Sequence, residues 1–188
     1  MSLAGPGAMN TELRIIPGRE CGSCSLCCKV YNIAELGKDI GKWCKHCQPG
    51  KGCMIHDHVP SQCARFECLW RTEEKLPPHW KPDRARMVLT INPITRYIYV
   101  QVDAGAPSAW LKQPYHGELR QWARNNLQKG IFVILFVNYE ATLIMPDQDI
   151  PIGRLQPADR LSVLSKSGGG APYEVTILPG AAAGSPAA

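Results

Sequence analysis

Residues 21–28 read Cys21-Gly-Ser-Cys24-Ser-Leu-Cys27-Cys28, a C-x2-C-x2-C-C pattern. This spacing suits a soft metal, because the turn between two such cysteines directs both sulfurs toward one ion, and thiolates favour zinc and iron–sulfur centres over hard cations. In a helix, positions 21, 24 and 28 would share one face with position 27 beside them, so the sulfurs converge in either conformation. Cys27 and Cys28 are adjacent, so they either serve different ions or bridge two ions.

All nine cysteines lie between Cys21 and Cys68, and the remainder of the 188-residue chain contains none. A secreted disulfide framework has an even cysteine count and a signal peptide, and the sequence shows neither. In a reducing compartment, cysteines clustered at short spacing indicate metal ligands. Eight of them would fill two four-thiolate sites and leave one spare. After the first four, the cysteines are Cys44, Cys47, Cys53, Cys63 and Cys68.

The pattern resembles the CxxCxxCC cysteine-cluster family (YkgJ-like), whose members are described as zinc- or iron-chelating proteins. Members open with C-x2-C-x2-C-C and later carry G-C-x-I-Y-x-x-R-P-x-x-C-x-x-F-x-C. Here the second segment reads Gly52-Cys53-Met-Ile-His56-Asp-His-Val59-Pro-Ser-Gln-Cys63-Ala-Arg-Phe-Glu-Cys68. The resemblance covers residues 19–70, with His56 where the family has tyrosine and Val59 where it has arginine.

The resemblance implies eight ligands and makes Cys44 an additional cysteine. His56 follows Cys53 at C-x2-H spacing, which is compatible with zinc, so Cys44 and His56 are the alternative ligands. The resemblance names zinc or iron and no reaction. The eight ligands that it implies are Cys21, Cys24, Cys27, Cys28, Cys47, Cys53, Cys63 and Cys68.

Composition indicates a globular protein, with 45% hydrophobic and 20% charged residues. The formal net charge of +5 falls to about +1 if eight thiolates bind two divalent ions, which weakens the case for a nucleic-acid partner. No stretch approaches the roughly 20 apolar residues needed to cross a bilayer, so no membrane association is expected. The expected location is the cytoplasm, where disulfides are rare.

We expect four segments along the chain. An N-terminal segment covers residues 1–20, and residues 1–8, ahead of Met9, resemble a remnant of an expression vector. A cysteine-rich metal-binding module covers 21–70, and an α+β sheet region covers 71–179. The small residues and proline of 180–188 predict a disordered tail.

The sheet region shows strand and helix patterns in alternation. Tyr97 and Tyr99 would share one strand face, which is either a binding surface or one side of a two-faced core. A flexible connection is expected over 166–172. The predicted fold class is α+β, with a loop-rich metal-binding cysteine module followed by an antiparallel sheet with one packed helix. The predicted elements are strands 87–92, 97–102, 131–137, 141–145 and 173–178, a helix 117–128 ended by Gly130, and turns at 93–96 and 138–140.

Three functions fit these patterns. The first is a zinc-binding module whose Zn²⁺ ions hold the loops together and present a surface to a protein partner. The second is an iron–sulfur protein in electron transfer or in an enzyme complex, although the C-x2-C-x2-C run lacks the fourth cysteine and proline of ferredoxins. The third, a zinc-dependent nucleic-acid binder, is weakened by the absence of a basic stripe interleaved with aromatic residues. No catalytic motif identifies a substrate, which leaves open whether the chain is an enzyme.

Overall fold

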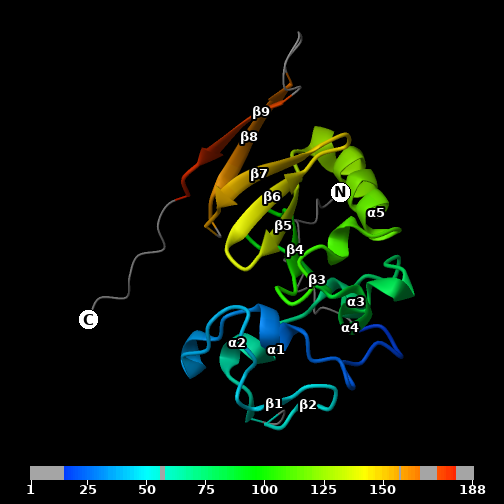
Figure 1. The fold of residues 1–188 in the computed structure, drawn as a ribbon, viewed down its shortest axis with the longest axis vertical. Helices are drawn as coiled ribbons and strands as arrows, with labels where there is room; N and C mark the ends of the chain where they lie inside the picture. Colours follow the sequence, from blue (N-terminus) through cyan, green and yellow to red (C-terminus); the bar gives the residue numbers. More distant parts are fainter. Residues whose placement is uncertain (1–14, 56–57, 157, 166–172, 181–188) are drawn as a thin grey trace, which may run out of the picture.

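The computed structural model describes residues 15–55, 58–156, 158–165 and 173–180, and it confirms the α+β class. A central sheet carries the long helix α5 (Tyr115–Asn126), and a loop-rich module that contains every cysteine lies at one end of the molecule (Figure 1). Several predictions fall outside the described residues. They concern residues 1–8, His56, the connection 166–172 and the tail beyond Gly180.

The central sheet is mixed, whereas we expected it to be antiparallel throughout. Strands β4 and β5 run parallel, with Val100 opposite Leu135, and the other neighbouring pairs are antiparallel. The difference arises because the chain leaves β4, crosses through α5 and returns beside β4, and such a crossover joins parallel strands. In spatial order the strands are β3 (Met87–Ile91), β4 (Ile98–Val102), β5 (Val133–Val137), β6 (Glu140–Ile144) and β7 (Asp149–Arg154).

The C-terminal strands form a separate antiparallel hairpin of β8 (Arg160–Ser165) and β9 (Tyr173–Leu178). The prediction of β9 is confirmed, but β7 and β8 were not predicted. Strand β7 contains Pro151 and Gly153, two residues that weaken a strand pattern and that are tolerated at a sheet edge, where β7 lies.

Both faces of the central sheet are buried. Val100 and Val102 belong to a cluster on the face that carries α5 and the cysteine module. Tyr97 and Tyr99 belong to a second cluster, which lies under the β8–β9 hairpin, and Tyr97 is only 4% exposed. This tyrosine face is therefore one side of a two-faced core, and Tyr97 also lines a cleft beside the β8–β9 hairpin.

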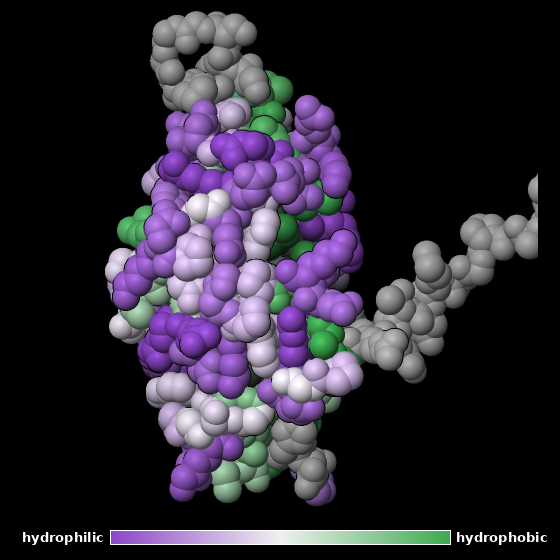
Figure 2. Space-filling view, turned by 90° about the vertical axis from the view of Figure 1, so that its right-hand side faces the viewer, coloured by the Kyte–Doolittle hydropathy of each residue, from purple (hydrophilic) through white to green (hydrophobic). Residues whose placement is uncertain are grey.

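Helix α5 buries the apolar stripe that its sequence predicted. Leu119 and Ala123 are buried against the sheet, while polar side chains dominate the outer face on this side of the molecule (Figure 2). The short helices η4 (Ala109–Leu111) and η5 (Leu127–Lys129) flank α5. Gly130, with φ of +65°, ends the helical segment as predicted, because glycine adopts this left-handed conformation without strain.

The cysteine module shares the sheet's core. Leu26, Val30 and Trp70 pack in the same cluster as Met87 and Leu89 of β3, so the module covers one face of the sheet. Its elements are α1 (Cys27–Val30), η1 (Ala34–Leu36), β1 (Cys47–Gln48), β2 (Gly52–Cys53), α2 (Ser61–Ala64) and the start of α3 (Leu69–Thr72). The short helices η3 (Pro78–Trp80) and α4 (Pro82–Ala85) then connect the module to β3.

Within the described parts of the chain, no helix combines the length and the apolar character that spanning a membrane requires.

Candidate metal centre

The first four cysteines combine a tight turn with a single helical turn. The N–H of Cys24 donates to the carbonyl of Cys21 at 2.7 Å, and Gly22, with φ of +49°, allows this turn. The N–H of Cys28 then donates to the carbonyl of Ser25 at 3.0 Å, which opens α1. The C-x2-C-x2-C-C segment therefore begins as a turn and continues as a helix, so it adopts both of the expected conformations.

Arg19 brings Cys21 beside Cys68, although the two are far apart in sequence. Its guanidinium donates to four backbone carbonyls that follow Cys68, and its Cζ lies 5.7 Å from the centre of the Trp70 ring. Arg19 could not be recognised from the sequence as a residue of the site, because its side chain binds backbone carbonyls, which belong to no sequence motif. The acceptors are the carbonyls of Trp70 at 2.9 Å, Glu73 at 2.9 Å, Glu74 at 3.1 Å and Leu76 at 3.0 Å.

Cys21, Cys24 and Cys68 form what we call the first thiol group. Burial raises the pKa of Cys68 to about 11, and the charges of Cys21 and Cys24 raise it as well. Burial also raises the pKa of Cys21 and that of Cys24. Cys68 thus responds to the charges of Cys21 and Cys24, while Cys21 also responds to the charge of Cys28, so this group lies close to the next one.

The second thiol group consists of Cys28, Cys44, Cys47, Cys53 and Cys63. The N–H of Cys44 donates to the carbonyl of Cys28 at 3.0 Å, and Cys47 pairs with Cys53 across the β1–β2 ladder. Burial raises the pKa of Cys47 to about 11, with the charge of Cys28 as the next cause. Cys44, the spare cysteine of the sequence analysis, therefore lies inside this group and is only 6% exposed.

Glu35 positions Cys63 in the second thiol group. Its carboxylate accepts from the Ser61 hydroxyl at 2.6 Å and from the N–H groups of Ser61 and Gln62 at 3.2 Å each. These bonds satisfy the free N–H groups at the start of α2, which carries Cys63. Burial is the main cause that raises the pKa of Cys63, and the charges of Cys28 and other thiols of the group raise it further.

Cys27 lies between the two groups. A hydrogen bond between the Cys27 and Cys28 side chains is the largest cause of the raised pKa of Cys28, ahead of burial. The phenol of Tyr31, whose pKa is raised chiefly by burial, also responds to the charges of Cys27 and Cys68. Cys27 therefore contacts Cys28 of the second group, and Cys27 and Cys68 both lie near the Tyr31 phenol.

The β1–β2 hairpin closely approaches the loop of the first thiol group. A Cβ atom placed on Gly52 would lie 3.1 Å from the carbonyl oxygen of Gly22, and Gly52 has φ of +106°. Only glycine combines this backbone conformation with this spacing. The approach packs the two loops that carry most of the cysteines against each other.

Lys29, the residue after Cys28, connects the module to the end of β4. Its Nζ lies 2.7 Å from Oδ1 of Asp103, a fully buried carboxylate that also pairs with Arg86. Burial alone would raise the pKa of Asp103, but the bonds from Lys29 and from the Gly105 N–H, together with Arg86, lower it below its ordinary value. The carboxylate is thus ionised, and it holds the module against the sheet.

The nine cysteines form no disulfide, so all nine sulfurs are available as ligands. In residues 15–55, 58–156, 158–165 and 173–180, no three histidine, cysteine, aspartate or glutamate side chains converge closely enough to hold a metal ion. The fold gathers the thiols into two neighbourhoods without closing a ligand shell. The donor chemistry suits zinc or iron, and binding would require the side chains to close around the ion.

Comparison with known proteins gives no relative: no family model, no curated protein and no solved structure matches this chain.

Proposed function

We propose that this chain is a metal-binding protein in which cysteine thiolates hold two Zn²⁺ ions with a structural and interaction role. The observation that carries the proposal is the gathering of nine free thiols, from separate segments, into one loop-rich module. We further propose that the protein works in the cytoplasm, where thiols stay reduced, and that its module presents a surface to a protein partner.

The two thiol groups suggest how the ligands divide. Cys27 would complete the first group, because that group otherwise holds three thiols and a closed zinc shell needs four. Four thiolates around each ion match the closed shell of structural zinc, and Cys44 is then the extra thiol of the second group. The proposed first site is Cys21, Cys24, Cys27 and Cys68, and the proposed second site is Cys28, Cys47, Cys53 and Cys63.

Zinc would supply folding free energy that the module lacks. The helices α1 to α3 contain four residues each, and isolated helices of this length are not stable. Structural zinc contributes on the order of 10 kcal/mol or more in small zinc-binding peptides. Because Leu26, Val30 and Cys68 belong to the core under the sheet, ions in the module would also stabilise the sheet.

An iron–sulfur centre is the second candidate function. The C-x2-C-x2-C run and the adjacent Cys27 and Cys28 favour it, since adjacent thiolates suit a polynuclear centre. Such a centre would serve electron transfer or an enzyme complex. The third candidate is a zinc-dependent nucleic-acid binder. It differs from the zinc-binding interaction module only in that the partner is a nucleic acid and not a protein.

Anaerobic purification followed by elemental analysis and a visible spectrum separates zinc from iron. We expect a colourless protein with about two zinc ions per chain. A brown protein that contains iron and inorganic sulfide would contradict the zinc proposal and support the second candidate.

Single substitutions test the division of ligands. We expect Cys24→Ser and Cys63→Ser each to lower the zinc content by one ion and to reduce solubility. Cys44→Ser is the matched control, because it removes a buried thiol of the same module that is assigned to neither shell. If Cys24→Ser and Cys63→Ser stay soluble with full metal, the ligand assignment is wrong.

A further inference from the structure

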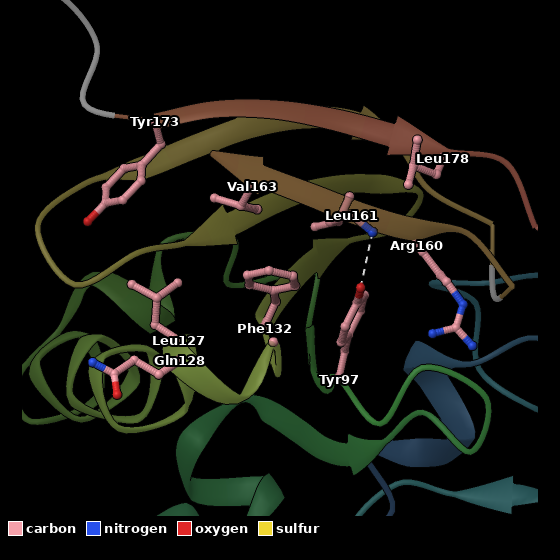
Figure 3. A pocket seen from close by; sticks show the side chains of 10 residues that line it. Tyr97, Leu127, Gln128, Phe132, Arg160, Leu161, Val163, Tyr173 and Leu178 are labelled. Carbon is pink, nitrogen blue, oxygen red and sulfur yellow. Dashed lines mark hydrogen bonds between the residues drawn. The ribbon is translucent and has the colours of Figure 1, made fainter. Parts of the chain in front are cut away.

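A cleft of about 580 Å³ lies on the sheet face that the cysteine module does not cover. It lies between the β8–β9 hairpin, the residues just before the interior strands β4 and β5, and the η5 turn after α5 (Figure 3). Its volume falls within the range of small-molecule sites. The cleft therefore stands apart from the thiol groups, and nothing inferred about it depends on the metal.

Apolar side chains line the middle of the cleft. Phe132 and Tyr97 rise from the central sheet toward Leu161 and Val163 of β8 (Figure 3). The rings of Tyr97 and Phe132 meet edge to face, with centroids 5.2 Å apart. These walls would accommodate an aliphatic or aromatic body, whose burial is favourable in proportion to the apolar area removed from water.

Polar groups stand at one end of the cleft. The N–H of Leu161 donates to the Tyr97 hydroxyl at 3.0 Å, so that hydroxyl keeps its own proton to donate. The Arg160 side chain lies at the same end, whereas Tyr173 and Leu127 lie at the other (Figure 3).

The charge of Arg160 is not neutralised within the described part of the chain. No carboxylate there forms an ion pair with it. The neighbouring Asp159 carboxylate binds backbone amides rather than Arg160, because it accepts from the N–H of Gln156 at 2.8 Å and from the N–H of Gly180 at 3.1 Å. The cleft thus combines apolar side chains, the Tyr97 hydroxyl and the exposed guanidinium of Arg160, which forms no ion pair with the described residues.

We propose that this cleft binds a small monocarboxylate with an apolar body. A carboxylate matches the fork of a guanidinium and also accepts from a phenolic hydroxyl, and bonds to charged groups are the stronger class. The apolar body would extend from Arg160 past Leu161 and Phe132 toward Leu127. One guanidinium and one hydroxyl match a single negative charge.

Three probes with the same phenyl-propyl body test the sign of the charge on the full-length protein. They are 4-phenylbutanoate, its neutral amide and the cationic 4-phenylbutylamine, each titrated by calorimetry and by the shift of the Leu161 amide signal in NMR. We expect the carboxylate to bind with a Kd on the order of 0.1–1 mM and the other two at least about tenfold more weakly. Equal binding of the three probes, or no binding at several millimolar, overturns the proposal.

Two substitutions test the residues. Arg160→Gln removes the guanidinium from an exposed position and should abolish the preference for the carboxylate over the amide. Arg154→Gln is the matched control, because Arg154 is an exposed arginine on β7 that does not line the cleft. If Arg160→Gln and Arg154→Gln bind 4-phenylbutanoate as tightly as the unchanged protein does, Arg160 is not the carboxylate partner and the proposal fails.

Discussion

Replacing Arg19 with methionine should weaken both the fold and the first thiol group. Arg19 holds the chain just before Cys21 against the segment just after Cys68 through four backbone carbonyls. Methionine keeps an alkyl chain to pack on Trp70, so the substitution chiefly removes the hydrogen bonds.

The expected loss of folding stability depends on how deeply each hydrogen bond of Arg19 is buried. Those to the carbonyls of Trp70 and Leu76 are partly buried, whereas those to Glu73 and Glu74 are exposed and are replaced by water. A hydrogen bond from a charged donor contributes about 1.5–3 kcal/mol when it is buried, and partial exposure places these two bonds at or slightly below the lower end of that range. We therefore expect Arg19→Met to lower the free energy of unfolding by about 2–3 kcal/mol and the Tm by about 5–10 °C.

Two assays check this prediction. Thermal and urea unfolding give the stability, and competition with a chromophoric chelator gives the affinity of each zinc ion. Arg19→Met should release one zinc ion at a lower chelator concentration and leave the second unaffected. Arg154→Met is the control, because the Arg154 side chain is 73% exposed and lies 3.8 Å from Glu140, a contact worth less than about 0.5 kcal/mol. The reasoning is refuted if Arg19→Met unfolds and releases zinc as the control does.

Three further substitutions test other parts of the account. Asp103→Asn should lower the free energy of unfolding by about 2–3 kcal/mol at pH 7, because it removes the buried negative charge that pairs with Lys29 and Arg86 and leaves an amide in its place. Since the pKa of Asp103 is lowered by folding, its contribution is present above the ordinary carboxyl pKa of about 3.9 and is lost as the pH falls through the folded value, so the two proteins should converge in acid-unfolding curves. Gly52→Ala should cost about 1–3 kcal/mol in urea unfolding, because of its positive φ and the contact with Gly22, and an unchanged midpoint would contradict that contact. Leu119→Ala should cost about 3 kcal/mol in the same assay, since Leu119 is fully buried under the sheet, and a loss below 1 kcal/mol would place it outside the core.

The regular part of the fold was largely predictable from periodicity. The apolar run that forms β5 and the amphipathic stripe of α5 are both strong local patterns, and both elements form. Strand β7 was missed because Pro151 and Gly153 interrupt its pattern. The parallel pairing of β4 with β5 was missed because strand direction depends on the path of the crossover, which local periodicity does not encode.

The sequence was enough to predict that cysteines form the candidate metal site, but not which cysteines lie close together. Cysteine spacing identified the module, yet the association of Cys21 with Cys68 depends on Arg19, whose acceptors are backbone carbonyls. In the same way, the place of Cys63 depends on Glu35, which caps a helix far along the chain. Side chains that act on distant backbone groups leave no local pattern, so only the folded chain reveals them.

Native mass spectrometry of the anaerobically purified chain can count the zinc ions that the folded protein holds. Each bound zinc ion adds its own mass and displaces thiol protons, so the mass reports the number of ions and of deprotonated ligands together. We predict a folded species with about two zinc ions per chain, and we expect the charge states to shift to those of an unfolded module when a chelator removes the metal. A folded species that carries no metal and is unchanged by the chelator would contradict the account.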